Sequence, residues 1–251
     1  MKTLALLASV AFFSGCVAST STFVQSNVVE EKIPKTEEPI QRVVDPAKDP
    51  YPFVGAFHLP NDRFIGSGVV IDKRFILTAA HVVHDEDSEM IPDKFRTFDG
   101  ETYCVKKITV HPLPVLHGVW LNDIAVVEVD RDIHVLPIKL KEPSDPIWKR
   151  MPVTTCGYAN GKKNYSSVGV FSYLGRLIAN PTSVIWIPWD ATIWFGDSGG
   201  ALMYVPPGQK ELKLIGVLGY LEIDKSKRRV VENGATSVDY YYNWIQEVMK
   251  R

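Results

Sequence analysis

Three short segments of this chain carry residue types that together could perform nucleophilic acyl transfer. His81 ends an apolar, strand-like stretch, Asp123 stands directly before a second one, and Ser198 lies in a glycine-rich loop before a third. A Ser hydroxyl becomes a good nucleophile when a neighbouring imidazole can take its proton. A buried carboxylate holds that imidazole in the required tautomer by accepting its other N–H. These types predict Ser198 as nucleophile, His81 as general base and then acid, and Asp123 as the group that orients His81.

The glycine-rich loop reads Phe-Gly-Asp-Ser-Gly-Gly over residues 195–200. Glycines let backbone N–H groups approach a tetrahedral oxyanion without a clashing Cβ. Any one of the three segments alone would be read as structural: a buried histidine, a carboxylate at the start of a strand, or a surface loop. Their joint occurrence in one chain favours the catalytic interpretation.

The other histidines have no such neighbours in the sequence, and we predict structural roles for them. They are His58, His84, His111, His117 and His134. No spacing of His, Cys and Asp predicts a metal site, and no glycine-rich loop has the pattern of a phosphate cradle. The sequence therefore predicts an enzyme that needs no metal and no cofactor.

The three segments resemble the signature motifs of the chymotrypsin/trypsin-like serine peptidases. Thr78–His81 reads Thr-Ala-Ala-His, Asn122–Ala125 reads Asn-Asp-Ile-Ala, and Gly196–Gly200 reads Gly-Asp-Ser-Gly-Gly, in the order of that family. This order of His, Asp and Ser differs from the orders found in subtilisins and α/β-hydrolases. The resemblance extends from about Tyr51 to the C-terminal end of the chain.

The resemblance implies an all-β fold of two antiparallel six-stranded β-barrels followed by a C-terminal α-helix. His81 and Asp123 would lie on the first barrel and Ser198 on the second, with the site between them. The backbone N–H groups of Gly196 and Ser198 would form the oxyanion hole. A protein or peptide would be the substrate.

By the same resemblance, Thr192 would lie at the base of the primary specificity pocket. Gly219, Tyr220 and Leu221 would form the wall of that pocket. Thr192 stands where an Asp would attract Lys or Arg, and Leu221 would shorten the pocket. We therefore expect a preference for small or medium apolar side chains.

Asp197 raises the question of activation. In trypsin-like enzymes the matching Asp pairs with an α-amino group that is released by cleavage, and this pairing orders the oxyanion loop. Cleavage after Arg42 would make Val43 the new N-terminus. The alternative is that Arg42 is an incidental residue of a linker, and the sequence leaves both open.

The elements that would position these residues are short apolar runs separated by Gly, Pro, Asn and Asp, which is typical of an all-β sandwich or barrel. We expect strands at Ser67–Ile71, Phe75–Leu77, Ile124–Val129, Val184–Ile187 and Leu214–Leu218. The expected barrels cover about 51–140 and 150–238. A helix is expected over 239–250, capped by Asp239, because Tyr241, Trp244, Ile245 and Val248 share one helical face.

The N-terminus has the order of an export signal. A charged start is followed by the apolar run Leu4–Phe13, about ten residues and too short to span a bilayer. Ser14-Gly15-Cys16 resembles the end of a bacterial lipoprotein signal, so residues 1–15 would be removed and Cys16 lipidated. The alternative is an ordinary secretory signal that is cut near Ala18 or Ser19.

Residues 16–50 are rich in Ser, Thr, Glu, Lys and Pro, and this composition predicts a flexible tether before a peptidase domain at 51–251. We therefore expect an exported protein of the cell envelope, anchored to a membrane through Cys16 on the periplasmic face or the cell surface. The alternative signal would make it secreted.

The 251 residues carry a formal net charge of −1, which gives no electrostatic reason to expect a nucleic-acid partner. Cys104 and Cys156 could form a disulfide or could be two small apolar residues, and the sequence does not choose between these.

Two other functions compete with an ordinary peptidase. A catalytically inactive relative would bind substrate without cutting it, but the three catalytic residue types are all present. A quality-control peptidase of the cell envelope would usually carry a PDZ domain, and the segment after Ser198 is too short for one.

Overall fold

The computed structural model describes residues 42–43, 48–84, 91–112, 115–116, 119–120, 122–148, 150–174, 183–188, 193–224 and 229–251. Only the backbone is described at 42–43, 115–116, 119–120, 166–174, 183–188, 220–224 and 229–232. All of these residues belong to one compact unit, Pro34–Arg251. The predicted lipidation site Cys16 and the predicted pocket base Thr192 lie outside the described residues.

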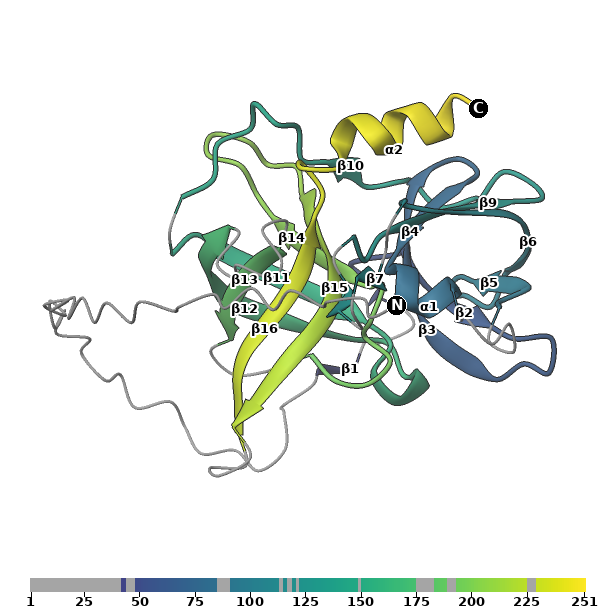
Figure 1. The fold of residues 1–251 in the computed structure, drawn as a ribbon, viewed down its shortest axis with the longest axis horizontal. Coiled ribbons are helices and arrows are strands. Elements are labelled where there is room, and N and C mark those ends of the chain that lie inside the picture. Colours follow the sequence, from purple (N-terminus) through teal and green to yellow (C-terminus); the bar gives the residue numbers. More distant parts are fainter. Residues whose placement is uncertain are drawn as a thin grey trace, which may run out of the picture. The chain divides into compact units, whose positions relative to one another are not determined.

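The first barrel is a closed ring of six antiparallel strands (Figure 1). In ring order they are β2 (Val54–His58), β3 (Phe64–Asp72), β4 (Phe75–Thr78), β9 (Ala125–Val129), β6 (Thr102–Val110) and β5 (Lys94–Arg96). Closure turns one face of every strand inward, and Val54, Phe57 and Val69 are fully buried there. The four-residue helix α1 (Ala80–Val83) follows β4 directly.

The second barrel is a ring of six antiparallel strands that closes through the pairing of β12 with β13. In ring order they are β12 (Asn164–Leu174), β11 (Pro152–Gly157), β14 (Ala201–Tyr204), β15 (Lys213–Asp224), β16 (Arg229–Ser237) and β13 (Ser183–Pro188). Four further strands have two residues each. They are β1 (Arg42–Val43), which pairs with β12, β10 (Lys139–Leu140), which runs parallel to β15, and β7 (Val115–Leu116) and β8 (Val119–Trp120), which pair with each other. A short 3-10 turn, η2 (Ala159–Gly161), separates β11 from β12.

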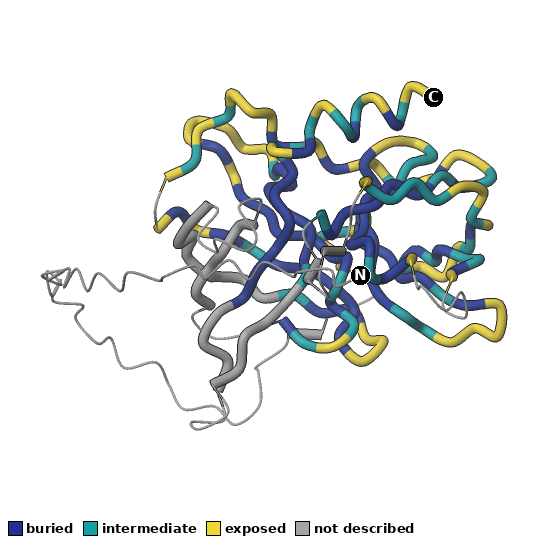
Figure 2. The backbone as a smooth tube through the Cα atoms, viewed as in Figure 1, coloured by how far each residue is buried: buried dark blue, intermediate teal, exposed yellow. Residues whose placement is uncertain are grey.

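The predicted fold class is confirmed, because all five expected strands lie within or overlap strands of the two barrels. One core cluster contains buried residues of both, from Val54 and Val69 in the first to Ala201 and Val217 in the second. Figure 2 shows these buried segments in dark blue. The two barrels therefore share one apolar core.

The C-terminal helix begins later than predicted. Helix α2 spans Tyr242–Met249, and Tyr241 rather than Asp239 precedes its first turn. The carboxylate of Asp239 is used elsewhere, since it accepts hydrogen bonds from Lys141 Nζ and from Ser237 Oγ. The predicted apolar face is confirmed, with Ile245 and Val248 buried.

Described residues within the predicted tether, residues 16–50, contact the second barrel. Strand β1 pairs with β12, and the side chain of Asp49 forms an ion pair with Lys163. This part of the predicted tether is thus fastened to the second barrel. No helix within the described ranges is long and apolar enough to cross a membrane.

The two cysteines of the domain are free thiols. Cys104 is exposed on β6, whereas Cys156 is buried on β11. Of the two alternatives left open by the sequence, the structure has the unpaired one. Burial also raises the pKa of the Cys156 thiol far above its usual value, so this residue acts as a small apolar side chain.

Candidate active site

His81 and Asp123 form the first half of the candidate site, on the first barrel. His81 lies in helix α1, and Asp123 lies just before β9. The His81 ring nitrogen Nδ1 is 2.8 Å from Asp123 Oδ2, and the His81 backbone N–H donates to Asp123 Oδ1 at 3.0 Å. Both carboxylate oxygens are therefore fastened to the same histidine, which fixes the ring and leaves Nε2 as the nitrogen for proton transfer.

Asp123 is buried and is held in place from the second barrel and its surroundings. Its backbone carbonyl accepts a hydrogen bond from Thr236 Oγ1 on β16 at 3.0 Å. Its neighbour Asn122 accepts a 2.6 Å hydrogen bond from the hydroxyl of Tyr241, at the start of the C-terminal helix. Gly219 on β15 passes close to the carboxylate, since a Cβ built there would lie 3.3 Å from Asp123 Oδ2.

The pKa of His81 reflects two opposing effects. Burial alone lowers it, but the charge of Asp123 and the hydrogen bond to its carboxylate outweigh burial, so the pKa is raised above the ordinary value of 6.5. A raised pKa makes the neutral imidazole a stronger base. It also means that His81 takes up a proton more readily during proton transfer.

The loop around Ser198 forms the second half, and two of its glycines are required by geometry. Gly196 has φ +99° and Gly199 has φ +82°, in the left-handed region that favours glycine. A Cβ on Gly196 would lie 2.6 Å from the carbonyl oxygen of Tyr158, and one on Gly199 would lie 2.1 Å from that of Ser67. The loop can thus adopt this path only with glycine at both positions.

Hydrogen bonds fix the direction of the two backbone N–H groups predicted to form the oxyanion hole. Phe195 O accepts from Asn160 N at 2.9 Å, and Asp197 O accepts from Gly200 N at 2.8 Å. In a trans peptide the N–H points opposite to the carbonyl of the preceding residue. The N–H groups of Gly196 and Ser198 therefore point away from these contacts, and neither has a hydrogen-bond partner among the described residues.

Ser67 on β3 joins the two halves. Its backbone N–H donates to Ser198 O at 2.8 Å, and its hydroxyl donates to Gly196 O at 2.8 Å. The hydroxyl also accepts from Tyr158 N at 3.0 Å, while Ser67 O accepts from Thr78 Oγ1 at 2.8 Å. One buried serine of the first barrel thus holds the nucleophile loop of the second.

The segment that carries His81 also packs near the loop around Ser198. A Cβ on Gly66 would be 2.7 Å from Val82 Cγ1 and 3.2 Å from Ser198 O. Gly66 is therefore packed between the residue that follows His81 and the carbonyl of Ser198. In this way the fold brings together the three sequence motifs that predicted the site.

Asp197, next to Ser198, is a buried carboxyl group. Oδ2 accepts from Trp194 N at 2.8 Å, and Oδ1 is 3.4 Å from the Asn164 amide nitrogen. Burial, which is opposed by hydrogen bonds from the backbone of Trp194, from Asn164 and from the backbone of Ala159, raises the pKa of Asp197 to about 7. A carboxyl group in this state would be stabilised in its charged form by a nearby cation.

Comparisons with known proteins agree with this geometry. Residues 40–245 match the family model described as Trypsin. The chain belongs to the trypsin family. It is 26% identical to venom serine protease 34 of Apis mellifera over 216 residues, which cover 72% of this chain and 51% of that protein. It is also 26% identical to the clotting factor G beta subunit of Tachypleus tridentatus over 298 aligned positions, covering 96% of this chain and 90% of that protein.

The chain thus spans about half the length of the venom protease that it matches. In this trypsin-family domain the predicted pocket wall lies on β15, where Gly219 borders Asp123 and where Tyr220 and Leu221 are described by their backbone alone. Among the described residues, no group of three or more His, Cys, Asp or Glu side chains is arranged to hold a metal ion.

Several residues that position this site could not be recognised from the sequence. Ser67 is expected from the sequence only as the first residue of a strand, and no sequence pattern assigns Thr236, Asn164 or Tyr241 to the site. Their hydrogen-bond partners at the site lie far away along the chain, so no local pattern marks them. For Ser67 the only signal was a polar residue at the centre of an apolar strand.

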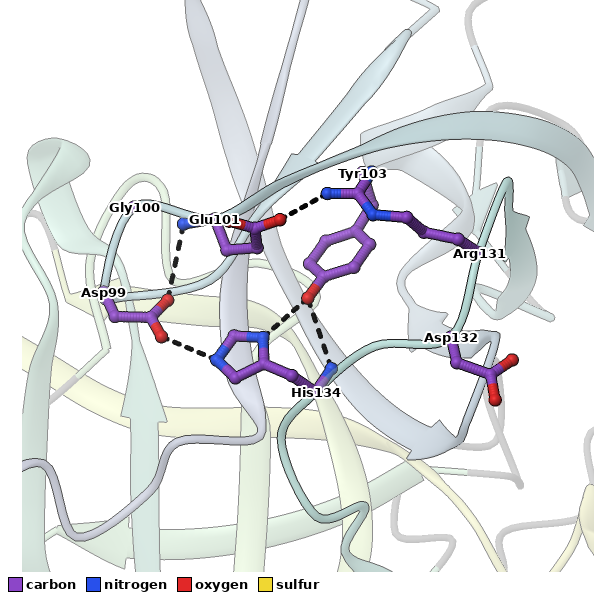
Figure 3. A pocket seen from close by; sticks show the side chains of 7 residues that line it. All are labelled: Asp99, Gly100, Glu101, Tyr103, Arg131, Asp132 and His134. Atoms are coloured by element: carbon purple, nitrogen blue, oxygen red, sulfur yellow. Dashed lines mark hydrogen bonds and ion pairs between the residues drawn. The ribbon is translucent and has the colours of Figure 1, made fainter.

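An open pocket of about 650 Å³ lies on the first barrel, away from these motifs (Figure 3). It is lined by Asp99, Gly100, Glu101, Tyr103, Arg131, Asp132 and His134. His134 Nδ1 is 2.6 Å from the Tyr103 hydroxyl, and Nε2 is 2.6 Å from Asp99 Oδ2. Because both ring nitrogens are bonded, His134 is held in one orientation.

Proposed function

We propose that this trypsin-family protein is a serine endopeptidase that cuts peptide bonds through an acyl-enzyme on Ser198. The observation that supports the proposal best is the two-point bonding of Asp123 to His81, 2.8 and 3.0 Å, beside a nucleophile loop tied to the same barrel through Ser67. This arrangement supplies a base of fixed tautomer and a loop with directed N–H groups, which are the parts that acyl transfer needs.

In the proposed reaction, His81 Nε2 takes the proton of Ser198 Oγ while that oxygen attacks the scissile carbonyl. The N–H groups of Gly196 and Ser198 stabilise the resulting oxyanion. His81 then gives its proton to the leaving amine, and the peptide bond breaks to leave an ester on Ser198. A water molecule then attacks the ester while His81 takes its proton. The bond to Ser198 Oγ breaks, the acyl group leaves as a carboxylic acid, and His81 returns the proton to Oγ, while Asp123 stays ionised throughout.

The alternative is a catalytically inactive relative that binds a protein or peptide without cutting it. A fluorophosphonate probe distinguishes the two, because it reacts only with an activated serine. We expect peptide mapping by mass spectrometry to find the probe on Ser198 and on no other residue, and to find none on the Ser198→Ala protein. A folded wild-type protein that takes up no probe, cleaved or intact, would favour the inactive relative.

We further propose that the primary pocket, with Thr192 at its base and Leu221 in its wall, prefers small or medium apolar side chains. A substrate Lys or Arg would place an unpaired cation there, which is strongly disfavoured. A peptide library should show weak cleavage after basic residues. Strong cleavage after Arg would show that an acidic side chain reaches the pocket.

Activation by cleavage after Arg42 is also part of the proposal. Strand β1 supports it, because Val43 pairs with Asn164, whose amide nitrogen is 3.4 Å from Asp197. The α-amino group of Val43 would supply a cation beside the Asp197 carboxyl group, whose pKa is raised by burial. Protein cut after Arg42 should be far more active than the intact chain, and Arg42→Gln protein should stay poorly active.

Finally, we propose that the protein is exported and anchored in the cell envelope through a lipid on Cys16. Two relatives are named as a venom protease and a clotting factor, and both names fit an exported protein. Wild-type protein should sediment with membranes, and Cys16→Ser protein should not. A mature N-terminus that begins after Cys16 would exclude the anchor.

A further inference from the structure

Lys163 is a fully buried lysine whose charge the proposed reaction does not use. Its Nζ is 2.6 Å from Asp49 Oδ2 and donates to Tyr51 O at 2.7 Å. The side chain is 0% exposed, and Nζ lies 5.0 Å from the centre of the Phe98 ring. A buried ammonium is costly unless it is paired, so these contacts define where the Asp49 segment must lie.

Asp49 is fixed equally well. Its second carboxylate oxygen, Oδ1, accepts the backbone N–H of Tyr51 at 2.9 Å, and its side chain is only 12% exposed. The ion pair therefore fastens the backbone at residues 49–51 to the start of β12. Replacing either partner alone would leave a buried charge without its counterpart.

The residue after Lys163 connects this ion pair to the nucleophile loop. Asn164 begins β12, pairs with Val43 of β1, and places its amide nitrogen 3.4 Å from Asp197 Oδ1. Gly157, the β11 partner of Asn164, gives Asp197 its space, since a Cβ there would lie 2.5 Å from Asp197 Oδ1. Two consecutive residues, Asn164 at the start of β12 and Lys163 directly before it, thus contact the N-terminal segment at Val43 and at Asp49.

We infer that Lys163 is a positioning residue which, through its ion pair with Asp49, holds Val43 within reach of Asp197. The inference rests on the activation step proposed above. Once the chain is cut after Arg42, the α-amino group must find a buried carboxylate. Because Asp49 is anchored only six residues after Val43, the effective concentration of the α-amino group at Asp197 stays high. Without this anchor the free N-terminal segment would be longer, and that concentration would fall. Lys163 therefore acts on the oxyanion loop only through the N-terminal segment.

The test compares how much cleavage raises activity in wild-type, Lys163→Met and Asp49→Asn proteins. An enteropeptidase recognition sequence in place of residues 38–42 lets each full-length chain be cut immediately before Val43. The rate of fluorophosphonate labelling is measured before and after the cut. For the cut proteins, the rate is also followed through the alkaline pH range, where the α-amino group loses its proton.

Lys141→Met is the matched control. Lys141 is a second buried lysine, 1% exposed, whose Nζ is 2.9 Å from Asp239 Oδ2 and donates to Glu142 O at 2.9 Å. It fastens the start of the C-terminal segment instead of the N-terminal one. Its loss should cost stability to a similar extent without changing the gain from cleavage.

In wild-type and Lys141→Met proteins we expect the cut to raise the labelling rate by the same large factor. In Lys163→Met and Asp49→Asn proteins the gain in labelling rate should be on the order of tenfold smaller than in the wild-type protein. The alkaline limb of the labelling rate should also move to lower pH, because the α-amino group is paired more weakly with Asp197. If Lys163→Met does not fold, the Asp49→Asn protein decides.

Equal gains in all four proteins, with the same alkaline limb, would overturn the inference and leave Lys163 a purely structural residue. No gain in the wild-type protein would instead overturn the activation step itself. The two failures are separate, because the wild-type chain is measured in the same experiment.

Discussion

The two halves of the candidate site differ in what holds them. The half that carries His81 and Asp123 is held by contacts of the folded barrels: two hydrogen bonds between them and a third from Thr236 to the backbone of Asp123. The half that carries Ser198 is a loop with two left-handed glycines beside a buried carboxyl group that has no cation among its described partners. The hydrogen bonds of the first half are present in the folded chain, whereas the buried carboxyl group of the second half has only hydrogen-bond donors as described partners.

This difference fits the proposal that the chain folds before cleavage activates it. His81 and Asp123 are already joined by two hydrogen bonds in the folded chain. The predicted oxyanion loop contains Asp197, whose pKa is raised by burial to about 7. Any group that supplies a cation there would stabilise the loop, and strand β1 places Val43 at the neighbouring residue.

The largest effect on kcat is expected from the loss of the Ser198 hydroxyl oxygen, the proposed nucleophile on which both halves of the site act. Ser198→Ala removes the nucleophile and should lower kcat for a peptide substrate by about 10⁴-fold or more, because the catalytic residues act as a unit. The thermal unfolding temperature should change little, which separates lost chemistry from lost fold. Near-normal peptide hydrolysis by this variant would end the serine-peptidase proposal.

A smaller loss is expected from Asp123→Asn, which breaks only the first half. The amide can no longer stabilise the imidazolium or favour the correct tautomer, so kcat should fall by roughly 10³- to 10⁴-fold. Asp123 is also the cause of the raised pKa of His81. The base is active when neutral, so activity rises with pH through this pKa, and the acid limb should move to lower pH in the variant. An unmoved limb would show that another group controls the titration.

Features that depend on residues close together in the chain could be predicted from the sequence. The strand β9 and the motif around Asp123 follow from apolar runs and residue order within a few positions. The links between the halves could not be predicted, because Ser67 reaches Gly196 across 129 residues and Thr236 reaches Asp123 across 113. Either bond depends on the barrels being closed and packed, which no short segment encodes.

The two errors at the ends of the domain have the same physical origin. Asp239 was expected to cap the helix, but it pairs with Lys141, which lies 98 residues away. Asp49 was expected to lie in a tether, but it pairs with Lys163 across 114 residues. In both places a carboxylate whose role was predicted from its neighbours in the chain forms an ion pair with a buried lysine from another part of the fold.

Ser67→Ala tests the connection between the halves. The variant loses the hydrogen bond to Gly196 O and leaves the N–H of Tyr158 without its acceptor. A buried group left unpaired costs about 1–3 kcal/mol, so the free energy of unfolding should fall by about that amount. Because Gly196 carries a proposed oxyanion donor, kcat should also fall, by roughly 10- to 100-fold. A stability loss with unchanged kcat would show that Ser67 does not control the loop.

The smallest effect is expected in the stability of the intact chain, and it isolates the open charge of the second half. The folded pKa of Asp197, about 7, lies above the ordinary value of 3.8, so the folded protein holds a proton that the unfolded chain releases. This contribution to stability is fully present below pH 3.8 and is lost as the pH rises through 7.

Asp197→Asn removes that titration. Between pH 5 and pH 8 the wild-type protein should therefore lose about 2 kcal/mol more of its free energy of unfolding than the variant does, as measured by urea unfolding. Cutting the wild-type chain before Val43 should shrink this difference, because an α-amino group beside Asp197 favours the charged carboxylate and lowers its pKa. If the intact wild-type and variant proteins lose stability in parallel over this range, Asp197 is already ionised in the intact chain. Its charge would then be balanced before any cleavage, and both halves of the site would be complete on folding.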